Sequence, residues 1–269
     1  MDLADIANPR ALARAVHRQI GPLSGPIAVK EIALALDIEE VREEEMDGCE
    51  GMLLTDRRRT RGKIAVNTRR GRQAARFGIG HELGHFLMER HELGLHGVLR
   101  CSLDDMRQAR SLRKHRQQEV EANEFAIGLL APDHALEPML GADPEIEAAM
   151  ELARSLDLSL EASTRCLVER HDEPLAAIWA KDGMIRYVIR GPSFPWITWS
   201  RGDRIPPLSL TRRHLAICGT GVSRMAEVAP AAWTKPDLPE LFEQVRIGRD
   251  GHSLTLLWAT LPEDSDGEE

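Results

Sequence analysis

Hydrophobic positions in the first quarter of the chain change from a helical to an extended spacing. Apolar residues recur every three or four positions in two stretches separated by Gly-Pro breakers, which predicts short helices at 11–20 and 27–36. Three short apolar segments bounded by charged or turn-forming residues then predict the strands of a small sheet, at 37–41, 51–54 and 63–67. The N-terminal part therefore combines helices with a sheet.

The next part of the chain is mainly helical in pattern. A helix is predicted over 73–89, and a second over 119–131, where Pro132 ends the apolar run. The residues between them, 90–116, are polar, basic and rich in histidine, which is typical of a mobile flap or lid.

A further helical pair is predicted at 146–156 and 160–168, with the outline of a helix-turn-helix. Its second helix offers only Arg165 and Arg170 as phosphate contacts and has acids nearby. An αα-hairpin packed on the preceding domain explains the same pattern, so both interpretations stay open.

Beyond Pro174 the pattern becomes that of an antiparallel sheet. Apolar runs on either side of the turns at 181–183 and 249–251 predict two β-hairpins. All five tryptophans lie in this half of the chain. Large aromatic residues in a small β-domain are core more often than they are platforms for stacking on bases or a small ligand.

These elements define an α+β protein of three parts and a tail. We expect a first domain over 1–138, a helical linker or helix-turn-helix-like segment over 139–173, and an antiparallel-sheet domain over 174–262. The acidic residues 263–269 are expected to be a disordered tail.

Composition places the protein among globular chains of the cytoplasm. Hydrophobic residues make up 42% of its 269 residues, which is ample for a core. Neither a signal-peptide pattern nor an apolar run of membrane-spanning length is visible, so we expect a cytoplasmic location and no membrane partner. The four cysteines are scattered without CxxC spacing, which favours reduced thiols.

Charge is distributed unevenly along the chain. Between Arg57 and Arg116 there are 16 Lys and Arg against 5 Asp and Glu, a local +11, so the rest of a chain of total charge -8 carries -19. Such a basic island could bind an anionic ligand, most plausibly single-stranded DNA, although a solvated basic face is the other interpretation. The candidate contacts are Arg57, Arg58, Arg59, Arg61, Arg69 and Arg70.

The strongest chemical signal is an HExxH motif within the predicted helix 73–89. His81 and His85 are four residues apart, so they project from one helical face and can share a metal ion, with Glu82 beside them to polarise a bound water. The surrounding apolar residues predict a buried helix, in which unpartnered polar groups would be costly. Two core histidines satisfied by hydrogen bonds are the plainer alternative.

The predicted helix at 119–131 supplies a third ligand. On a wheel of about 100° per residue, Glu119 lies near the middle of the apolar face, where a carboxylate needs a partner. Glu121 falls on the opposite side, where solvent suffices for it. The sequence therefore predicts a Zn²⁺ site of His81, His85 and Glu119, with Asn123 hydrogen-bonded to a ligand histidine.

Two further roles near this site are a fourth metal ligand and an oxyanion-stabilising residue. A thiolate of Cys101 could occupy the open fourth coordination position and keep an enzyme latent, or Cys101 could be a free cysteine without a role. No oxyanion-stabilising residue stands out, since each candidate is more often a plain surface histidine. These candidates are His91, His96, His115 and His134.

The motifs at 64–67, 76–85 and 119–132, with the leading helix at 27–38, resemble the ImmA/IrrE family of zinc metallopeptidases. The resemblance covers residues 27–132 and implies a small zincin-like, gluzincin-type peptidase domain with a zinc cofactor. It also implies that the substrate is a helix-turn-helix repressor, cleaved to switch on a DNA-damage response, a mobile element or a phage-defence operon. The longer members resemble this chain in a helix-turn-helix-like middle and a GAF- or PAS-like sensor domain.

Two functions from different classes remain at this point. The first is a zinc metallo-endopeptidase with Glu82 as general base, latent until triggered, with single-stranded DNA as a possible activator. The second is a DNA-binding regulator with a structural zinc site and no proteolysis. The intact Glu82 counts against the second, because a structural site has no use for an adjacent base.

Overall fold

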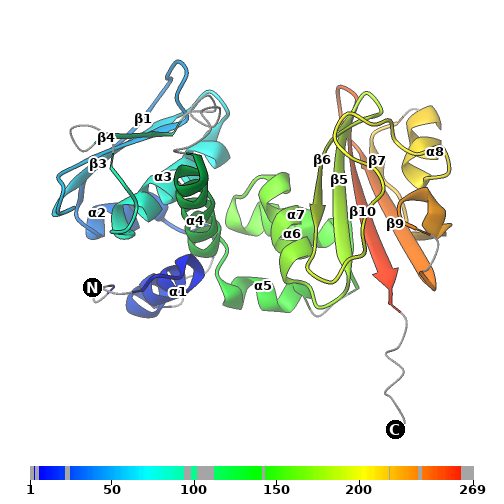
Figure 1. The fold of residues 1–269 in the computed structure, drawn as a ribbon, viewed down its shortest axis with the longest axis horizontal. Coiled ribbons are helices and arrows are strands. Elements are labelled where there is room, and N and C mark those ends of the chain that lie inside the picture. Colours follow the sequence, from blue (N-terminus) through cyan, green and yellow to red (C-terminus); the bar gives the residue numbers. More distant parts are fainter. Residues whose placement is uncertain are drawn as a thin grey trace, which may run out of the picture. The chain divides into compact units, whose positions relative to one another are not determined.

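The computed structural model describes Leu3 and residues 6–21, 25–93, 98–101, 112–140, 143–217, 219–235 and 238–261. The chain divides into two compact units (Figure 1). Unit 1 consists of Met1–Leu136 with Arg154–Ser159, and unit 2 of Glu137–Ala153 with Leu160–Glu269. The helical segment expected over 139–173 is thus shared between the two units.

Unit 1 contains a small mixed sheet in the order β1-β3-β2-β4. Strands β1 (Ile38–Glu44) and β3 (Gly62–Asn67) pair in parallel, and β2 (Gly51–Thr55) pairs antiparallel with β3 and with β4 (Val98–Cys101). The alternating burial along β2 and β3 explains why these short apolar segments form strands with one face towards the core. Strand β4 lies in the stretch predicted as a flap, and the start of α4 (Leu112–Leu130) is the other regular element in the described part of that stretch.

Helices cover this sheet and form the framework of unit 1. Helix α3 (Arg72–Leu87) packs on β2, β3 and α2 (Val29–Ala35), while α4 (Leu112–Leu130) packs on α3 and on α1 (Pro9–Ile20). The predicted helices are present, but α4 begins seven residues before the predicted 119 because its first two turns are polar and basic and carry no apolar period.

The predicted helical pair is formed by α6 (Ile146–Leu156) and α7 (Leu160–Arg170), with α5 (Asp133–Leu140) before them. Apolar residues of α6 and α7 pack against the sheet of unit 2. The turn between the two helices belongs to unit 1, where Asp157 forms ion pairs with Arg72 and Arg76 of α3. DNA reading by this pair stays a prediction.

Unit 2 is built on an antiparallel sheet in the order β6-β5-β10-β9-β7, with β8 also paired to β9. The two predicted hairpins form the main part of this sheet. One joins β5 to β6, and the other joins β9 to β10. The strands are β5 (Leu175–Lys181), β6 (Met184–Arg190), β7 (Gly221–Val222), β8 (Ala226–Val228), β9 (Glu240–Ile247) and β10 (His252–Thr260). Helix α8 (Leu210–Ile217) and the short helix η3 (Pro230–Ala232) were not predicted, because both are too short to show a period.

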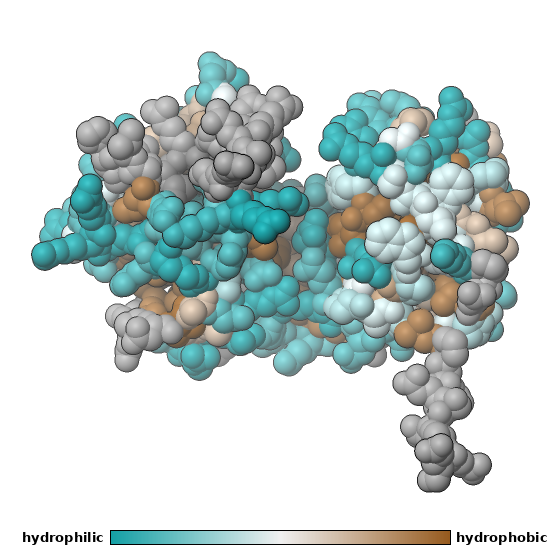
Figure 2. Space-filling view, viewed as in Figure 1, coloured by the Kyte–Doolittle hydropathy of each residue, from teal (hydrophilic) through white to brown (hydrophobic). Residues whose placement is uncertain are grey.

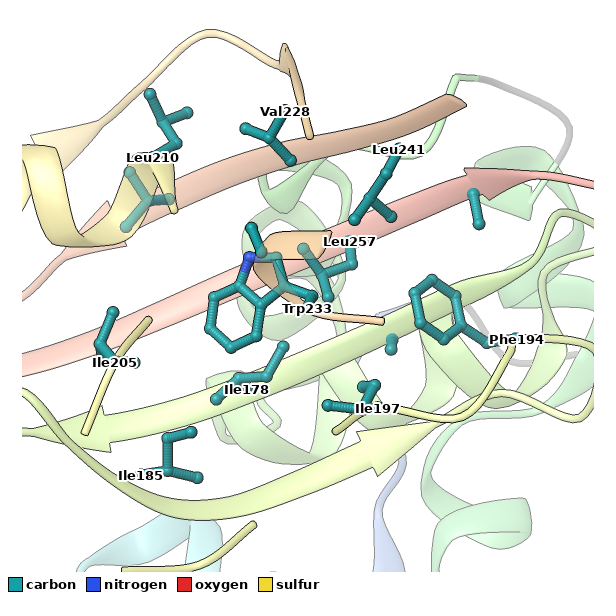
Figure 3. Close-up of a cluster of buried hydrophobic side chains, with 14 of the residues drawn as sticks. Ile178, Ile185, Phe194, Ile197, Ile205, Leu210, Val228, Trp233, Leu241 and Leu257 are labelled. Atoms are coloured by element: carbon teal, nitrogen blue, oxygen red, sulfur yellow. The ribbon is translucent and has the colours of Figure 1, made fainter. Parts of the chain in front are cut away.

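The core on one face of this sheet surrounds Trp233, which is fully buried (Figure 3). Glu243 of β9 is also fully buried, and its carboxylate accepts hydrogen bonds from the indole Nε1 of Trp233, from the Leu210 amide, and from both the amide and the hydroxyl of Thr211. The carboxylate thereby caps the N-terminus of α8. Among the described residues, no helix has the length and apolar character required to span a membrane.

Candidate metal centre

Two helices of unit 1 approach each other closely because glycines lie at their contact. A Cβ added at Gly80 would lie 3.3 Å from the Cβ of Ala126, and one added at Gly84 would lie 3.0 Å from a ring atom of Phe125 and 3.4 Å from the Cα of Ala122. Glycine therefore lets α3 and α4 pack backbone to backbone, which brings the HExxH segment beside α4.

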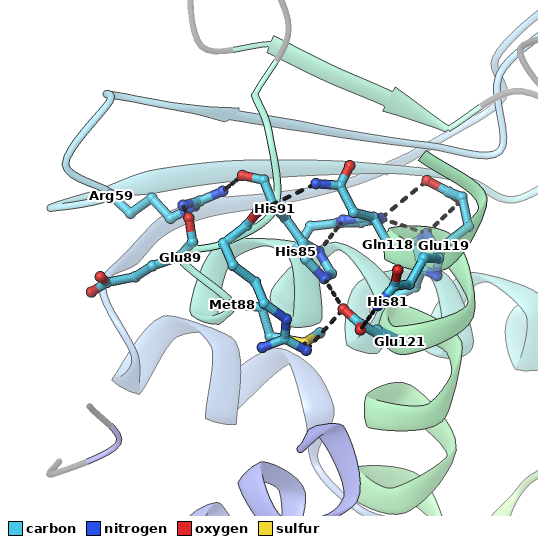
Figure 4. Close-up of polar contacts among 11 residues, drawn as sticks. Arg59, His81, His85, Met88, Glu89, His91, Gln118, Glu119 and Glu121 are labelled. Atoms are coloured by element: carbon cyan, nitrogen blue, oxygen red, sulfur yellow. Dashed lines mark hydrogen bonds and ion pairs between the residues drawn. The ribbon is translucent and has the colours of Figure 1, made fainter. Parts of the chain in front are cut away.

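The predicted ligands from the two helices meet at one point. Glu119 Oε2 lies 3.3 Å from His81 Nε2, Glu119 Oε1 lies 3.3 Å from His85 Nε2, and the two Nε2 atoms are 3.1 Å apart. One ligand atom from each residue lies within 4.8 Å of the other two. The three side chains thus form a candidate metal group (Figure 4).

Hydrogen bonding fixes the tautomer of His81. Its Nδ1 lies 3.0 Å from Oδ1 of Asn123, one turn beyond Glu119 on α4. The amide oxygen can only accept, so Nδ1 carries the proton and Nε2 presents its lone pair to the cluster. Asn123 thus occupies the supporting position predicted for it.

His85 is held in the same way by a chain of two further residues. Glu121 Oε2 accepts a 2.9 Å hydrogen bond from His91 Nε2, and His91 Nδ1 lies 2.9 Å from His85 Nδ1. Because His91 donates through Nε2, its Nδ1 accepts the proton of His85 Nδ1, which leaves the lone pair of His85 Nε2 facing the cluster. Figure 4 shows His91 between His85 and Glu121.

The prediction that Glu121 faces solvent was therefore wrong. The wheel placed Glu121 correctly on another side of α4, but the chain after α3 returns to cover that side and sets His91 and Arg90 against it. His91, which is 2% exposed, is a buried member of this network. Its proximity in sequence to the HExxH motif was a signal for a role beside the metal group.

Several contacts fix the segment that carries His91. The guanidinium of Arg59 donates to the backbone carbonyls of Glu89, at 2.7 Å, and of His91. Gln118 of α4 donates to the carbonyl of Arg90 at 3.5 Å, and the Arg90 guanidinium lies 2.8 Å from Glu121. Position 91 is thus tied both to the β2–β3 turn and to α4.

Burial and the charges in the cluster shift the pKa values of its members. Burial lowers the pKa of His85 to about 4, against the opposing influence of Glu119. Burial also acts to lower the pKa of His81, but the hydrogen bond that its protonated form donates to Glu119 and the charges of Glu82 and Glu119 outweigh it, so this pKa is raised. Burial would raise the pKa of Glu119, yet the hydrogen bonds that the protonated forms of His81 and His85 donate to it hold this pKa well below its usual range.

The donor set fits a transition-metal ion. With the tautomers above, two imidazole lone pairs and a carboxylate face one another across a few ångströms, an arrangement of electron-pair donors that a cation between them stabilises. Two imidazoles and one carboxylate are a ligand set used by catalytic zinc sites, which leave a further position open. The group is therefore a candidate metal centre on its own chemistry.

Glu82 lies beside this group in a position that Gly51 makes possible. The Glu82 side chain is fully buried, and a Cβ added at Gly51 of β2 would overlap Oε1 of Glu82 and lie 3.1 Å from its Cδ. Gly51 therefore leaves the space that the carboxylate occupies. A buried carboxylate next to two imidazoles and a third ligand is the arrangement that general-base catalysis requires.

Comparison with known proteins agrees with this geometry. Residues 40–165 match the family model of the IrrE N-terminal-like domain, a peptidase domain. This segment is therefore similar to the IrrE N-terminal-like peptidase domain. It contains the whole of the candidate metal group, so the resemblance drawn from the motifs is confirmed at the level of the domain.

The fold as a whole is similar to a solved structure. A "Mycobacterium tuberculosis transcriptional regulator" matches with a TM-score of 0.57 and 14% sequence identity, over 94% of this chain and 76% of that chain. At this identity the likeness shows the fold alone. No curated protein matches the sequence of this chain.

Other candidate residues of the IrrE N-terminal-like domain have mixed positions. His115 Nδ1 lies 3.8 Å from Glu119 Oε1, at the edge of the metal group, whereas His91 supports His85. His96 lies outside the described residues. Cys101 ends strand β4, paired in register with Gly51, and its binding to the metal stays a prediction.

The arginines predicted to contact nucleic acid are largely engaged with the protein. Arg61 pairs with Glu39 at 2.9 Å, Arg70 lies 3.7 Å from Glu50, and Arg69 pairs with Asp47. Arg59 is bound to backbone carbonyls, while Arg57 and Arg58 are exposed. Nucleic-acid binding by this set stays a prediction, and four of its six members would have to exchange present partners for phosphates.

Proposed function

We propose that this protein is a zinc-dependent endopeptidase that cleaves a helix-turn-helix transcriptional repressor and so derepresses a stress, mobile-element or defence operon. The observation that carries the proposal is the convergence of His81, His85 and Glu119 beside a buried Glu82, within an IrrE N-terminal-like peptidase domain. The zinc identity, the repressor and the operon are parts of the proposal.

In this mechanism His81, His85 and Glu119 would hold the metal through Nε2, Nε2 and a carboxylate oxygen. When bound, the metal would lower the pKa of a water towards about 7 and polarise the scissile carbonyl. Glu82 accepts the proton of the attacking water and later delivers it to the leaving amine. Asn123 and His91 keep the imidazoles oriented throughout.

Replacing the base separates catalysis from metal binding. Glu82→Gln keeps the shape of the side chain but removes its basicity, so we expect unchanged metal content and a rate of repressor cleavage lower by at least about 100-fold. Glu89→Gln, in the exposed turn after α3, is the matched control and should cleave normally. Undiminished cleavage by Glu82→Gln protein would refute the assignment of the base.

The substrate proposal is tested with a helix-turn-helix repressor encoded beside this protein. Zinc-loaded protein is incubated with the repressor, with and without single-stranded DNA, and the products are identified by mass. Cleavage at one site supports the endopeptidase. DNA binding with an intact repressor under every condition supports the regulator with a structural zinc site instead.

Latency is a separate part of the proposal. Cys101 would occupy the fourth metal position until a trigger such as single-stranded DNA removes it, and the C-terminal sheet would serve as a GAF- or PAS-like sensor. The register that pairs Cys101 with Gly51, beside Glu82, supports this idea. Cys101→Ser should raise basal cleavage without the trigger, and equal basal rates would remove the thiolate from the scheme.

A further inference from the structure

A second basic surface lies in unit 2, away from the segment in which the sequence concentrated positive charge. The stretch from Lys181 to Arg213 carries one lysine and six arginines against Asp182 and Asp203, a net charge of +5 on a protein of total charge -8. The side chains of the six arginines are exposed: Arg186, Arg190, Arg201, Arg204, Arg212 and Arg213.

These arginines differ from those of unit 1 in having no acidic partners. None of the six forms an ion pair with any residue that the structure describes, whereas Arg61, Arg69 and Arg70 all do. Asp203, one of the two acids in this stretch, accepts hydrogen bonds from the amide and hydroxyl of Ser200. Unneutralised guanidinium groups on an acidic protein indicate a surface that receives an anion.

The backbone arranges these residues along the edge strand β6. Arg204 is bridged to Met184 at the start of β6, and an atom added as Cβ of Gly183 would lie 3.7 Å from Nη1 of Arg212. Arg186 lies within the strand, and Arg190 ends it. Since a strand rises about 3.3 Å per residue, the positive groups follow a line roughly 20 Å long.

An aromatic platform stands at one end of this line. Trp196 is 70% exposed, more than any other tryptophan of the protein, and the Cζ of Arg190 lies 5.7 Å from the centre of its ring. On the face of unit 2 seen in Figure 2, pale and hydrophobic residues are interleaved with hydrophilic ones. Arg190 also donates to the carbonyl of Phe194 at 2.9 Å but has no acidic partner among the described residues. A solvent-exposed indole beside such arginines combines a stacking surface with phosphate ligands.

We propose that this surface of unit 2, formed by β6 and the loop that follows it, binds single-stranded nucleic acid. The arginines contact phosphates, and Trp196 stacks on an unpaired base. A duplex is disfavoured because its bases are already stacked and offer no face to the indole. This inference gives the proposed single-stranded DNA trigger a binding surface, and so it rests on the trigger in the proposed function. Binding can be measured without cleavage.

The test uses full-length Glu82→Gln protein and a labelled 20-nucleotide oligo-dT, with fluorescence anisotropy as the readout. Trp196→Ala should weaken binding by roughly 5- to 100-fold, and Trp196→Phe should restore most of the affinity. The double variant Arg186→Ala/Arg204→Ala should reduce the slope of log K against log salt by about 1.4, the value for two phosphate contacts on a single strand.

Two charge-matched controls locate the site. Arg224→Ala/Arg249→Ala removes two exposed arginines elsewhere in unit 2, and Arg14→Ala/Arg18→Ala removes two exposed arginines of α1 in unit 1; both should leave affinity and salt slope nearly unchanged. An oligo-rU of the same length distinguishes RNA from DNA as the preferred strand, and either preference supports the proposal.

Three results would overturn it. The first is no binding at low salt, and the second is equal affinity of wild-type and Trp196→Ala protein. The third is equally strong competition by a duplex, by poly-glutamate or by anionic vesicles, which would show a general anionic or acidic-partner surface. Because the protein carries Glu82→Gln, none of these outcomes depends on peptidase activity.

Discussion

Each unit surrounds one glutamate with a polar network, and the two networks differ in the direction of their protons. Glu243 of unit 2 is surrounded by donors: an indole N–H, two backbone amides and a hydroxyl all point at its carboxylate. Glu119 of unit 1 faces the Nε2 atoms of His81 and His85, whose protons are directed away to Asn123 and His91. The first network is complete within the protein, and the second has the donor set of a candidate metal site.

This difference separates Glu243, a carboxylate that supports the fold, from Glu119, a carboxylate placed among candidate metal ligands. A satisfied carboxylate stabilises the fold, since each donor it accepts would otherwise be buried without a partner. Lone pairs that converge without a donor between them cost stability in the absence of an ion and favour binding of one. Burial alone does not distinguish the two; the direction of the protons does.

The largest expected effect comes from removing the satisfied carboxylate. Glu243→Ala leaves four donors buried without their acceptor, so we expect the free energy of unfolding of unit 2 to fall by on the order of 4 kcal/mol. Urea unfolding followed by tryptophan fluorescence reports this directly, because all five tryptophans are in unit 2. Glu119→Ala should leave that transition unchanged and abolish metal binding. Similar unfolding curves for the two variants would contradict the different roles assigned to Glu243 and Glu119.

A smaller effect should appear as a pH dependence of the metal-free protein. The pKa of His85 is lowered from 6.5 to about 4, so the folded state disfavours the protonated form, and the associated stability is present above pH 6.5 and is lost as pH falls towards about 4. The full shift corresponds to roughly 3 kcal/mol.

His81 has the opposite sign and a different window. Its raised pKa contributes stability below pH 6.5 that is lost as pH rises through the folded value. Urea unfolding followed by circular dichroism at pH 7, 5.5 and 4 should therefore show a loss on acidification that His85→Gln reduces. An equal loss in the variant would place the pH dependence elsewhere in unit 1.

The smallest of the three effects concerns the chain from Glu121 through His91 to His85. His91→Ala and Glu121→Gln should each weaken metal binding by about 10- to 100-fold, because outer hydrogen bonds fix the tautomer of a ligand histidine. Competition with a chromogenic chelator measures this affinity without any assay of cleavage. Glu124→Gln on the same helix is the control, and metal affinities of His91→Ala and Glu121→Gln that match it would refute the supporting role.

Local patterns predicted that His81, His85 and Glu119 come together, because each position depends on spacing within one helix. His81 and His85 follow from i, i+4 geometry, and Glu119 from its angle on the apolar face of α4. Glu121 was misplaced because its partner His91 arrives from a non-periodic segment, whose path only the tertiary structure determines. The same limit hid Gly51, whose importance arises from a strand packing against the HExxH helix.

Counting charges along the sequence locates the basic residues but does not show which of them are neutralised. The sequence shows that basic residues concentrate between Arg57 and Arg116, but the sheet of unit 1 brings Glu39, Glu50 and Asp47 against them. In unit 2 the six exposed arginines between Arg186 and Arg213 form no ion pair with the residues that the structure describes. Pairing across strands, which no linear count contains, decides which positive charges remain available to a partner.

The glycines at the contact of α3 and α4 have a consequence for which ions the centre accepts. With Gly80 and Gly84 against Ala122, Phe125 and Ala126, no flexible side chain separates the two ligand-bearing helices, so the opening between the three donors has little freedom to widen. Ca²⁺ needs six to eight oxygen ligands at about 2.3–2.6 Å, whereas Zn²⁺ is satisfied by about four donors near 2.0–2.1 Å. The distance between α3 and α4 would thus select ions by their radius. A substitution that increased this distance would reduce the selectivity for small ions before it disturbed the fold.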